Sequence, residues 1–375
     1  MGSSKLIHMK NKKRLLWVTN MPAPYRLPIL DLLGATYEVE VYFLLGQENW
    51  RNWPLTGMER SWKHHFLNLK TYFIKEFELI LSFGLGIRNL SSFDIIVLGS
   101  WENPIYLRLM YRAKKLGKVI VAIYESHSDS QKFKKGTVAS IRRRFFQAAS
   151  FVVTFGPSST RAIKDMGVHD KSILELFNLV DNFWFFKNVK HSKRSIDNGH
   201  VFLCVGRLIP IKNIQAAISA FAQISSNADI LRVVGAGPDY TDLRTLAKEM
   251  GVDHQVEFLG HLSQEELLTV FGNSQTLILP SKTEVWGLVV NEALACGLHA
   301  VVSSRAGVSE SVRKHRGVYI SAPEPEDLSK YMMKSKSDWS GWISNPEIMS
   351  FNKEIFVKEL IRRINSEMET GNRTS

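Results

Sequence analysis

The sequence has 375 residues, of which 45% are hydrophobic and 22% are charged. This composition is typical of globular proteins and excludes disordered and collagen-like chains, while the length favours about two domains. There is no run of 18 apolar residues, so a membrane-spanning helix is not expected. Cys204 and Cys296 lack the spacing of metal ligands, so we expect neither a zinc site nor disulfides, and a reducing cytoplasm as the location.

The net charge of +12 is unevenly distributed. Residues 1–190 hold 28 Lys and Arg against 15 Asp and Glu, whereas residues 191–375 hold 20 against 21. A basic first half favours an anionic partner: nucleic acid, a phosphate-bearing substrate or a membrane surface. The alternative is a set of solvated lysines that only aid solubility.

Residues 1–9 precede the expected fold, and the short apolar stretch after the basic residues 10–14 does not resemble a secretion signal. Beyond them, short apolar runs alternate with stretches of helical periodicity. In the first half we expect strands at Leu15–Thr19, Val39–Leu45, Asp94–Gly99, Val119–Tyr124 and Phe151–Thr154, with helices at Pro104–Leu116 and Thr137–Ala149. In the second half we expect strands at Val201–Val205, Ile230–Val234, Val256–Leu259, Thr276–Leu279, Ala300–Ser303 and Val318–Ile320. Buried strands alternating with helices predict an α/β fold with two doubly wound parallel sheets.

The polar, aperiodic stretch at 187–199 is typical of a linker. We therefore expect a first domain at 10–190 and a second at 191–345. Apolar residues at helical spacing between Asn352 and Met368 predict a final helix, and the segment 346–375 is expected to pack back on the first domain.

Ligands of open α/β sheets bind beyond the carboxyl ends of the strands, so the loops after the second-half strands are the candidate site. Gly206 ends one strand, and Arg207 and Lys212 follow it with a planar guanidinium and a compact ammonium, which suit a diphosphate. After the next strand, Gly235 and Gly237 allow close backbone approach to a ligand. The alternatives are solvated basic side chains and an ordinary glycine turn.

The segment 280–297 carries most of the prediction. A buried strand ends at its start, and a helix is expected from Leu288, whose free N–H groups and dipole favour an anion. The carboxylates of Glu284 and Glu292 suit sugar hydroxyls, because each accepts two hydrogen bonds. The alternatives are that Glu284 only complements the helix dipole and that Glu292 forms a surface ion pair. The turn at 303–310 either closes over the same ligand or is an ordinary helix start.

Together these motifs resemble the nucleotide-sugar half of the retaining glycosyltransferase family 4, whose GT-B fold has two Rossmann-like domains facing a central cleft. The resemblance rests on Gly206-Arg207 with Lys212, on 234–238 and 258–260, and on Glu284 and Glu292 eight positions apart. It is strong from 200 to 312 and weaker across 10–190, where it rests on 20–26 and 178–181.

The resemblance implies that Arg207 and Lys212 bind the donor diphosphate and stabilise it as leaving group, without a metal ion. It places Glu284 on hydroxyls of the transferred sugar and Glu292 on the ribose. The donor-binding set that it implies is Gly206, Arg207, Lys212, Gly235, Gly237, Gly260, His261, Leu262, Glu284, Gly287, Leu288, Val289 and Glu292. The sequence departs from the family pattern in two places. It has Pro22-Ala23-Pro24 where the family often has a glycine-rich loop that closes on the donor, and Ala306-Gly307 where the family usually has Gly-Gly at the sugar pocket.

In the first half, His127 follows an expected strand, at the place where family members often have a histidine near the reacting sugar. The expected catalytic set is therefore His127, Arg207, Lys212 and Glu284, although a lone histidine can also be structural. Trp101, Glu102 and Asn103 end the preceding strand and are the expected acceptor contacts.

Cationic and aromatic residues are interleaved in the first half at 132–135 and 141–146, and between Arg60 and Leu90. The aromatic and apolar members of the last segment are Trp62, Phe66, Tyr72, Phe73, Phe77 and Leu79. Such a surface favours docking on anionic lipid, and hence a lipid-linked acceptor. The alternative is that the aromatic residues form the core of the first domain.

The sequence thus predicts a retaining hexosyltransferase that uses a nucleotide-diphosphate sugar, with no other cofactor, and a glycan or lipid-linked acceptor in cell-surface polysaccharide or glycolipid synthesis. Its expected location is the cytoplasm, peripheral on the inner face of the membrane. One alternative is another GT-B enzyme, such as a sugar phosphorylase or an epimerase. A nucleic-acid-binding protein, suggested by a pI of about 9.5, is least favoured because no recognition motif accompanies the charge.

Overall fold

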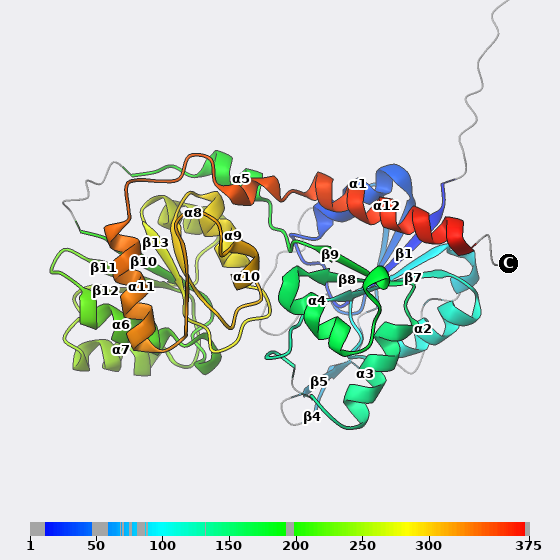
Figure 1. Ribbon diagram of the computed structural model, residues 1–375, viewed down its shortest axis with the longest axis horizontal. Coiled ribbons are helices and arrows are strands. Elements are labelled where there is room, and N and C mark those ends of the chain that lie inside the picture. The colour runs from blue at the N-terminus through cyan, green and yellow to red at the C-terminus, as the bar shows by residue number, and fades with distance from the viewer. Residues whose placement is uncertain are drawn as a thin grey trace, which may run out of the picture.

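The computed structural model describes residues 12–46, 59–67, 69, 71–74, 77–80, 87, 89–131, 133–192 and 199–371. These residues form two lobes that lie side by side, each built on a parallel sheet flanked by helices (Figure 1). The order of strands within each sheet decides where its ligand-binding edge lies.

The first sheet has seven parallel strands in the order β3-β2-β1-β6-β7-β8-β9. Their bounds are β1 Arg14–Thr19, β2 Glu38–Phe43, β3 Lys63–Phe66, β6 Ile95–Leu98, β7 Val119–Tyr124, β8 Phe151–Phe155 and β9 Ile173–Leu176. The helices of this lobe are α1 Leu27–Thr36, α2 Pro104–Lys115, α3 Thr137–Ala148 and α4 Gly156–Asp165. A separate antiparallel hairpin joins β4 Thr71–Ile74 to β5 Phe77–Ile80.

The second sheet has six parallel strands in the order β12-β11-β10-β13-β14-β15. Their bounds are β10 Val201–Val205, β11 Ile230–Val234, β12 Val256–Gly260, β13 Thr276–Leu279, β14 His299–Ser303 and β15 Val318–Ser321. The helices are α6 Ile214–Ile224, α7 Tyr240–Glu249, α8 Gln264–Gly272, α9 Leu288–Ala295, α10 Ser309–Val312 and α11 Pro325–Ser337. Local sequence explains their ends: α8, for example, begins with a capping box between Ser263 and Glu266.

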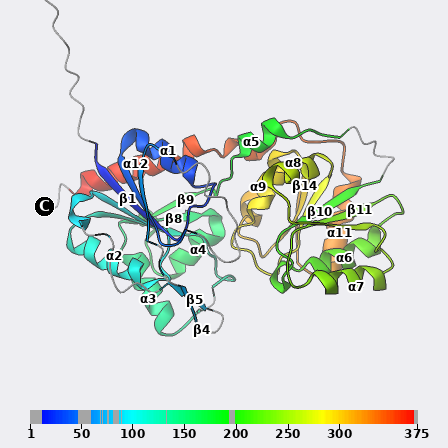
Figure 2. The ribbon, with the colours of Figure 1, turned by 180° about the vertical axis from the view of Figure 1, so that it is seen from behind.

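Two helices connect the lobes. The helix α5, Asn182–Asn188, follows the first sheet in the chain but packs against α9 of the second. The last helix, α12 at Lys353–Gly371, returns to the first lobe and lies along α1, as both views show (Figures 1 and 2). Its Phe356 stacks on Phe155 at the end of β8, with ring centroids 6.3 Å apart.

The prediction of two doubly wound parallel sheets is confirmed. Burial on both faces explains why the strand residues were recognisable: Val201 to Cys204 of β10 are fully buried. The strands β3 and β9 were missed because both lie at sheet edges and carry partly exposed side chains. Within the described ranges, no helix is long and apolar enough to cross a membrane.

Candidate functional site

The topology of the second sheet brings two loops together. The chain leaves β10 towards β11 on one side, while β13 pairs with β10 on the other side, so the strand order reverses between β10 and β13. Ligands of open α/β sheets bind at such a switch point, outside the carboxyl ends of the strands. The loop after β10 contains Gly206, Arg207 and Lys212, and the loop after β13 contains Glu284.

An ion pair joins these loops: Lys212 Nζ contacts Glu284 Oε2. The two side chains are 21% and 17% exposed, so each is partly withdrawn from water yet open to a ligand. Ser281 Oγ also donates to the Glu284 carboxylate, at 3.5 Å. The cation expected to bind phosphate and the carboxylate expected to bind sugar are therefore neighbours, and Glu284 does more than complement a helix dipole.

Asn213 fixes the position of Lys212, a feature that the sequence analysis missed. It adopts a left-handed conformation, with φ 57° and ψ 35°, between the short 3₁₀ turn Pro210–Lys212 and α6. Its buried side-chain amide donates to the carbonyls of Pro280 at 3.0 Å and Pro323 at 2.8 Å. Asparagine tolerates this conformation better than most residues, so a lone Asn before a helix is the signal that was available.

The glycines after β11 are required by packing. A Cβ on Gly235 would lie 1.9 Å from the carbonyl oxygen of Gly206, and one on Gly237 would lie 2.2 Å from that of Leu208. Loop 235–237 is therefore pressed against loop 206–208, and Gly235 N donates to Gly260 O at 2.7 Å. Their contact with a ligand stays a prediction.

Arg207 has an exposed side chain, with no ion pair or hydrogen bond to another residue that the structure describes. His261 is likewise exposed and Leu262 half-buried, directly after Gly260 at the end of β12. All three lie in loops at the same edge of the sheet as Lys212 and Glu284. Their predicted donor contacts stay predictions.

The helix α9 begins at the same edge of the sheet. Gly287 precedes it with φ 100°, and a Cβ there would lie 2.8 Å from a methyl carbon of Leu279. The first N–H groups of a helix, here from Leu288 and Val289, have no partner within the helix and favour an anion. Burial raises the pKa of Glu292, one turn into α9, to about 7. In the described part of the chain Glu292 makes no ion pair, so the surface-pair alternative does not apply.

His127 reaches this site from the other lobe. It follows β7, is 5% exposed, and its Nε2 lies 2.9 Å from the backbone oxygen of Glu284. Because a carbonyl oxygen only accepts, the Nε2 atom carries the proton and donates. Gly307 N donates to the same oxygen at 3.0 Å, which ties the loops after β13 and β14 together.

The expected acceptor residues lie after β6. Trp101 is half-buried under the Arg142 guanidinium, whose carbon lies 5.3 Å from the ring centroid. Glu102 is exposed, and Asn103 is buried directly before α2. Their contact with an acceptor stays a prediction.

The expected basic and aromatic surface needs a correction. Arg142 is buried and donates to Gln131 and to the Phe133 carbonyl, and Phe145 and Phe146 lie in the core, because the inward face of α3 packs on the sheet. Trp62 is also buried. Lys132 and the side chains of Tyr72, Phe73, Phe77 and Leu79 lie outside the described residues.

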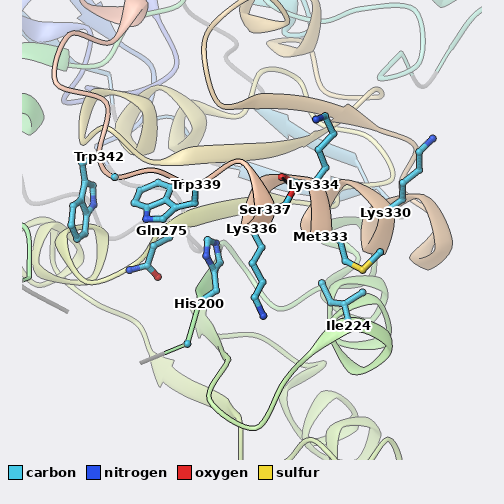
Figure 3. A pocket seen from close by; sticks show the side chains of 12 residues that line it. His200, Ile224, Gln275, Lys330, Met333, Lys334, Lys336, Ser337, Trp339 and Trp342 are labelled. Atoms are coloured by element: carbon cyan, nitrogen blue, oxygen red, sulfur yellow. Dashed lines mark hydrogen bonds between the residues drawn. The ribbon is translucent and has the colours of Figure 1, made fainter. Parts of the chain in front are cut away.

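A cavity of about 780 Å³ lies at the opposite edge of the second sheet (Figure 3). Its lining includes His200 and Gln275, which precede β10 and β13, and Trp339 and Trp342 beyond α11. None of the predicted site residues lines it. Its position before the strands, not after them, separates it from the loops at the switch point.

Known proteins are similar to this chain over the region that contains the loops of the candidate site. The family described as Glycosyl transferases group 1 matches residues 186–350. A glycosyltransferase of Methanocaldococcus jannaschii is 31% identical over 152 residues, 39% of each chain. The N-acetyl-alpha-D-glucosaminyl L-malate synthase of Bacillus anthracis is 27% identical over 149 residues, 38% of this chain and 39% of its own. The matched region thus spans about two fifths of these relatives.

Solved structures match over nearly the whole chain. HepE of Anabaena in complex with UDP aligns with a TM-score of 0.67 and 15% identity, covering 96% of this chain and 100% of HepE. The lipopolysaccharide outer core galactosyltransferase WaaB aligns with a TM-score of 0.69 and 16% identity, covering 94% and 99%. The chain therefore has the GT-B fold, and its residues 186–350 match the group 1 glycosyl transferases.

Proposed function

We propose that this protein is a retaining glycosyltransferase that moves a hexose from a nucleotide-diphosphate sugar to a glycan or lipid-linked acceptor in the synthesis of cell-surface polysaccharide or glycolipid. The observation that carries the proposal is the Lys212–Glu284 pair at the switch point, with His127 of the other lobe on the same loop. Relatives of similar chemistry support it: one is described as a GDP-mannose-dependent mannosyltransferase of Corynebacterium glutamicum.

When the donor binds, the two residues of the ion pair separate and contact different parts of the donor. Lys212 and Arg207 bind the diphosphate, and Lys212 exchanges the Glu284 carboxylate for phosphate oxygens. Glu284 then accepts hydrogen bonds from hydroxyls of the sugar, while the N-terminus of α9 adds its N–H groups. Glu292 accepts the ribose hydroxyls. Fixed positive groups of this kind stabilise the charge that develops on the leaving group.

Transfer breaks the bond between the anomeric carbon and the diphosphate oxygen and forms a bond from that carbon to the acceptor oxygen. The proton of the acceptor hydroxyl passes to the leaving phosphate oxygen. His127 stands beside the sugar subsite and orients the reacting groups through its Nε2–H. Retention of configuration and independence of metal ions are what the family resemblance implies.

The acceptor side of the proposal rests on α2 and α3, which pack together on the first lobe. Their exposed basic side chains, with those just before α3, are Arg108, Lys114, Lys115, Lys134, Lys135, Arg143 and Arg144. None of these seven forms an ion pair with another described residue. Tyr111, Leu116, Val138 and Ile141 are exposed among them. This surface, the α2–α3 face, has the charge and apolar content to dock on anionic lipid, beside the acceptor loop that precedes α2.

Donor turnover tests the proposed function. The protein is incubated with UDP, GDP and ADP sugars, and release of the nucleoside diphosphate is measured with and without glycan and lipid acceptors. We expect release with one donor class, and loss of at least about 100-fold in Lys212→Ala and Glu284→Ala, while both variants keep the wild-type melting temperature within a few degrees. Near-normal turnover in both variants would contradict the site, and sugar-1-phosphate formed from glycan and inorganic phosphate would indicate a phosphorylase instead.

A further inference from the structure

A mostly buried network of hydrogen bonds links the two lobes at the loop after β13 that carries Glu284, here called the donor loop, and part of this network surrounds Arg26. Arg26 precedes α1 in the loop after β1, and its guanidinium lies 4.6 Å from the ring centroid of Phe155. Its side chain is 13% exposed. The Nη2 atom donates to Glu125 Oε1 at 2.5 Å and to Asn178 Oδ1 at 3.4 Å. A single guanidinium therefore contacts both the loop after β7, at Glu125, and the segment between β9 and α5, at Asn178. We call this segment, residues 177–181, the crossover.

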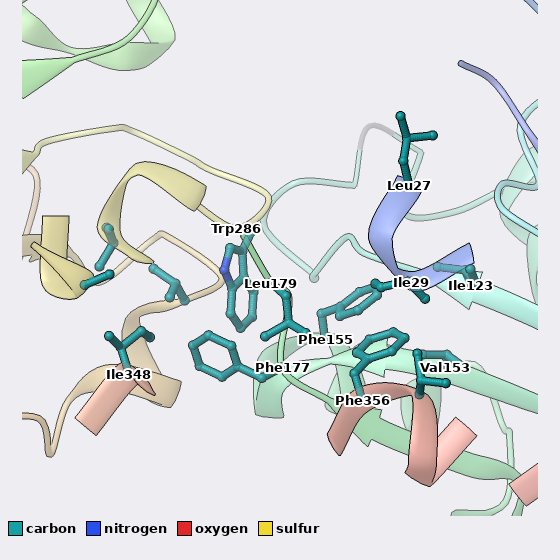
Figure 4. Packing of buried hydrophobic residues seen from close by; sticks show 14 of the residues in the cluster. Leu27, Ile29, Ile123, Val153, Phe155, Phe177, Leu179, Trp286, Ile348 and Phe356 are labelled. Atoms are coloured by element: carbon teal, nitrogen blue, oxygen red, sulfur yellow. The ribbon is translucent and has the colours of Figure 1, made fainter. Parts of the chain in front are cut away.

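The crossover is joined to the donor loop on the other side. Asn178 O accepts from Asn291 Nδ2 at 2.7 Å, and Asn291 Oδ1 accepts from Trp286 Nε1 at 3.2 Å. Trp286 and Asn291 are 3% and 0% exposed. Phe177 packs edge-on against the Trp286 indole, with centroids 5.0 Å apart (Figure 4). Trp286 is two residues from Glu284, so these contacts join the crossover to the donor loop.

The network closes into a ring at His127. Glu125 is two residues before His127, whose Nε2–H donates to the Glu284 backbone oxygen at 2.9 Å. The ring therefore runs from Glu284 through Trp286, Asn291, Asn178, Arg26 and Glu125 to His127 and back to Glu284. It joins residues of the two lobes at two points, Asn178 with Asn291 and His127 with Glu284. Buried networks of satisfied hydrogen bonds fix one arrangement of the chain.

We infer that Arg26 is a positioning residue for His127. It acts through Glu125 on the His127 loop and through Asn178 on the donor loop, and so sets the histidine against the sugar subsite. This inference rests on the proposed function, because the position of His127 matters for rate only if that subsite holds the donor sugar. The donor contacts themselves come from Lys212, Glu284 and Glu292 on the second lobe and do not involve Arg26.

The inference predicts a separation of kcat from KM. Arg26→Met and Glu125→Ala should each lower kcat about tenfold or more, since small misplacements of catalytic groups are costly. The donor KM should stay within about twofold, and the double variant should be no slower than the worse single variant, because the two residues act as one unit. Glu125→Gln keeps the acceptor for Arg26 and should restore most of kcat.

A matched control is Arg161, whose ion pair with Glu310 joins α4 of the first lobe to α10 of the second, outside the ring. Arg161→Met should leave kcat within about twofold of the wild type. If it lowers kcat as much as Arg26→Met does, the effect is general loosening of the lobes and the inference is overturned. A rise in the acceptor KM of Arg26→Met with kcat unchanged would overturn it too, by making Arg26 a substrate contact.

A spectroscopic readout separates this inference from the proposed function. In ¹⁵N histidine spectra of the full chain, His127 should be the Nε2–H tautomer in the wild type and in Arg161→Met, and should lose that preference in Arg26→Met and Glu125→Ala. Glu125 is about one-third exposed, so its alanine variant is expected to fold even if Arg26→Met does not. An unchanged tautomer in Glu125→Ala overturns the inference, whereas absence of donor turnover in the wild type contradicts only the proposed function.

Discussion

At the scale of single residues, the candidate site depends on a few side chains that hold loops in place. The sequence predicted Lys212 and Glu284 because each belongs to a motif, and the structure pairs them. It did not predict Asn213 or Arg26, because their partners lie far away in the chain: Asn213 binds the Pro323 carbonyl, 110 positions on. A hydrogen bond over such a separation leaves no periodic pattern in the sequence.

Asn213 offers a stability test at this scale. Asn213→Gly keeps the left-handed conformation but loses both hydrogen bonds, so we expect it to lower the free energy of unfolding by about 2 kcal/mol. Asn213→Ala should lose about 1 kcal/mol more, because alanine also disfavours this conformation. Urea unfolding measures both values. Equal stability of the two variants would contradict the conformational part of the account.

Glu292 gives the site a pH dependence. Its pKa of about 7, raised by burial, means that the carboxyl group is half protonated at neutral pH and mostly protonated at pH 6. A carboxylate accepts both ribose hydroxyls and the protonated form does not, so donor affinity should fall below pH 7 by up to about tenfold per pH unit. Titration calorimetry from pH 8 to 5.5 measures this, and Glu292→Gln should flatten the profile. A wild-type profile that is already flat would rule out ribose binding by the ionised group.

At the scale of elements, sequence patterns predicted the buried strands and missed the strands whose side chains are partly exposed. Continuous apolar runs located β10, β11 and β13 with both ends correct. The edge strand β3, with sequence Lys63-His64-His65-Phe66, carries charge and aromatic residues on a partly exposed edge and has no such run. Helix α3 was found, but its inward residue Arg142 was placed on the surface, because a charged residue on an amphipathic helix is usually solvated.

His200, directly before β10, should make the free energy of unfolding depend on pH. Burial lowers the pKa of His200 to about 3, and its Nε2 lies 2.8 Å from Thr276 Oγ1. Since an unfolded histidine titrates near 6.5, the unfolded state binds more protons below that pH, and stability falls as pH falls. The expected loss is about 2 kcal/mol between pH 7 and 5.

Chemical unfolding of His200→Gln at pH 7 and 5 checks this. The variant should lose about 2 kcal/mol less than the wild type on acidification, because its side chain does not titrate. The exposed His254, changed to Gln, is the matched control and should behave as the wild type does. The same pH dependence in all three proteins would show that folding does not lower the pKa of His200.

At the scale of the whole molecule, two sheets place the loops of the candidate site on one lobe and, among the described residues, the basic side chains of the α2–α3 face on the other. The sequence predicted both lobes and the uneven charge. It could not predict how the lobes meet, because the contacts of His127 with Glu284 and of Asn178 with Asn291 join residues more than 100 positions apart. The likeness to HepE and WaaB extends over both lobes and concerns the fold.

The docking on anionic lipid that we propose for the α2–α3 face can be tested with vesicles. Flotation should recover the protein with anionic vesicles and not with neutral ones. Replacing Lys134 and Lys135 by Ser on the α2–α3 face should weaken binding by about 2 kcal/mol, roughly thirtyfold. Arg313 and Lys314, an exposed basic pair on the second lobe, changed to Ser, are the control and should leave binding unchanged. Equal recovery with neutral vesicles would contradict an electrostatic docking surface.

Above all, we propose that Lys212 binds the diphosphate of the donor and that Glu284 binds its sugar. Titration calorimetry of nucleoside diphosphate and of the corresponding nucleotide sugar, for the wild type, Lys212→Met and Glu284→Gln, tests it most directly. We expect Lys212→Met to weaken the binding of both ligands, and Glu284→Gln to weaken the binding of the nucleotide sugar while that of the nucleoside diphosphate stays unchanged. Equal affinities of all three proteins for both ligands would contradict it.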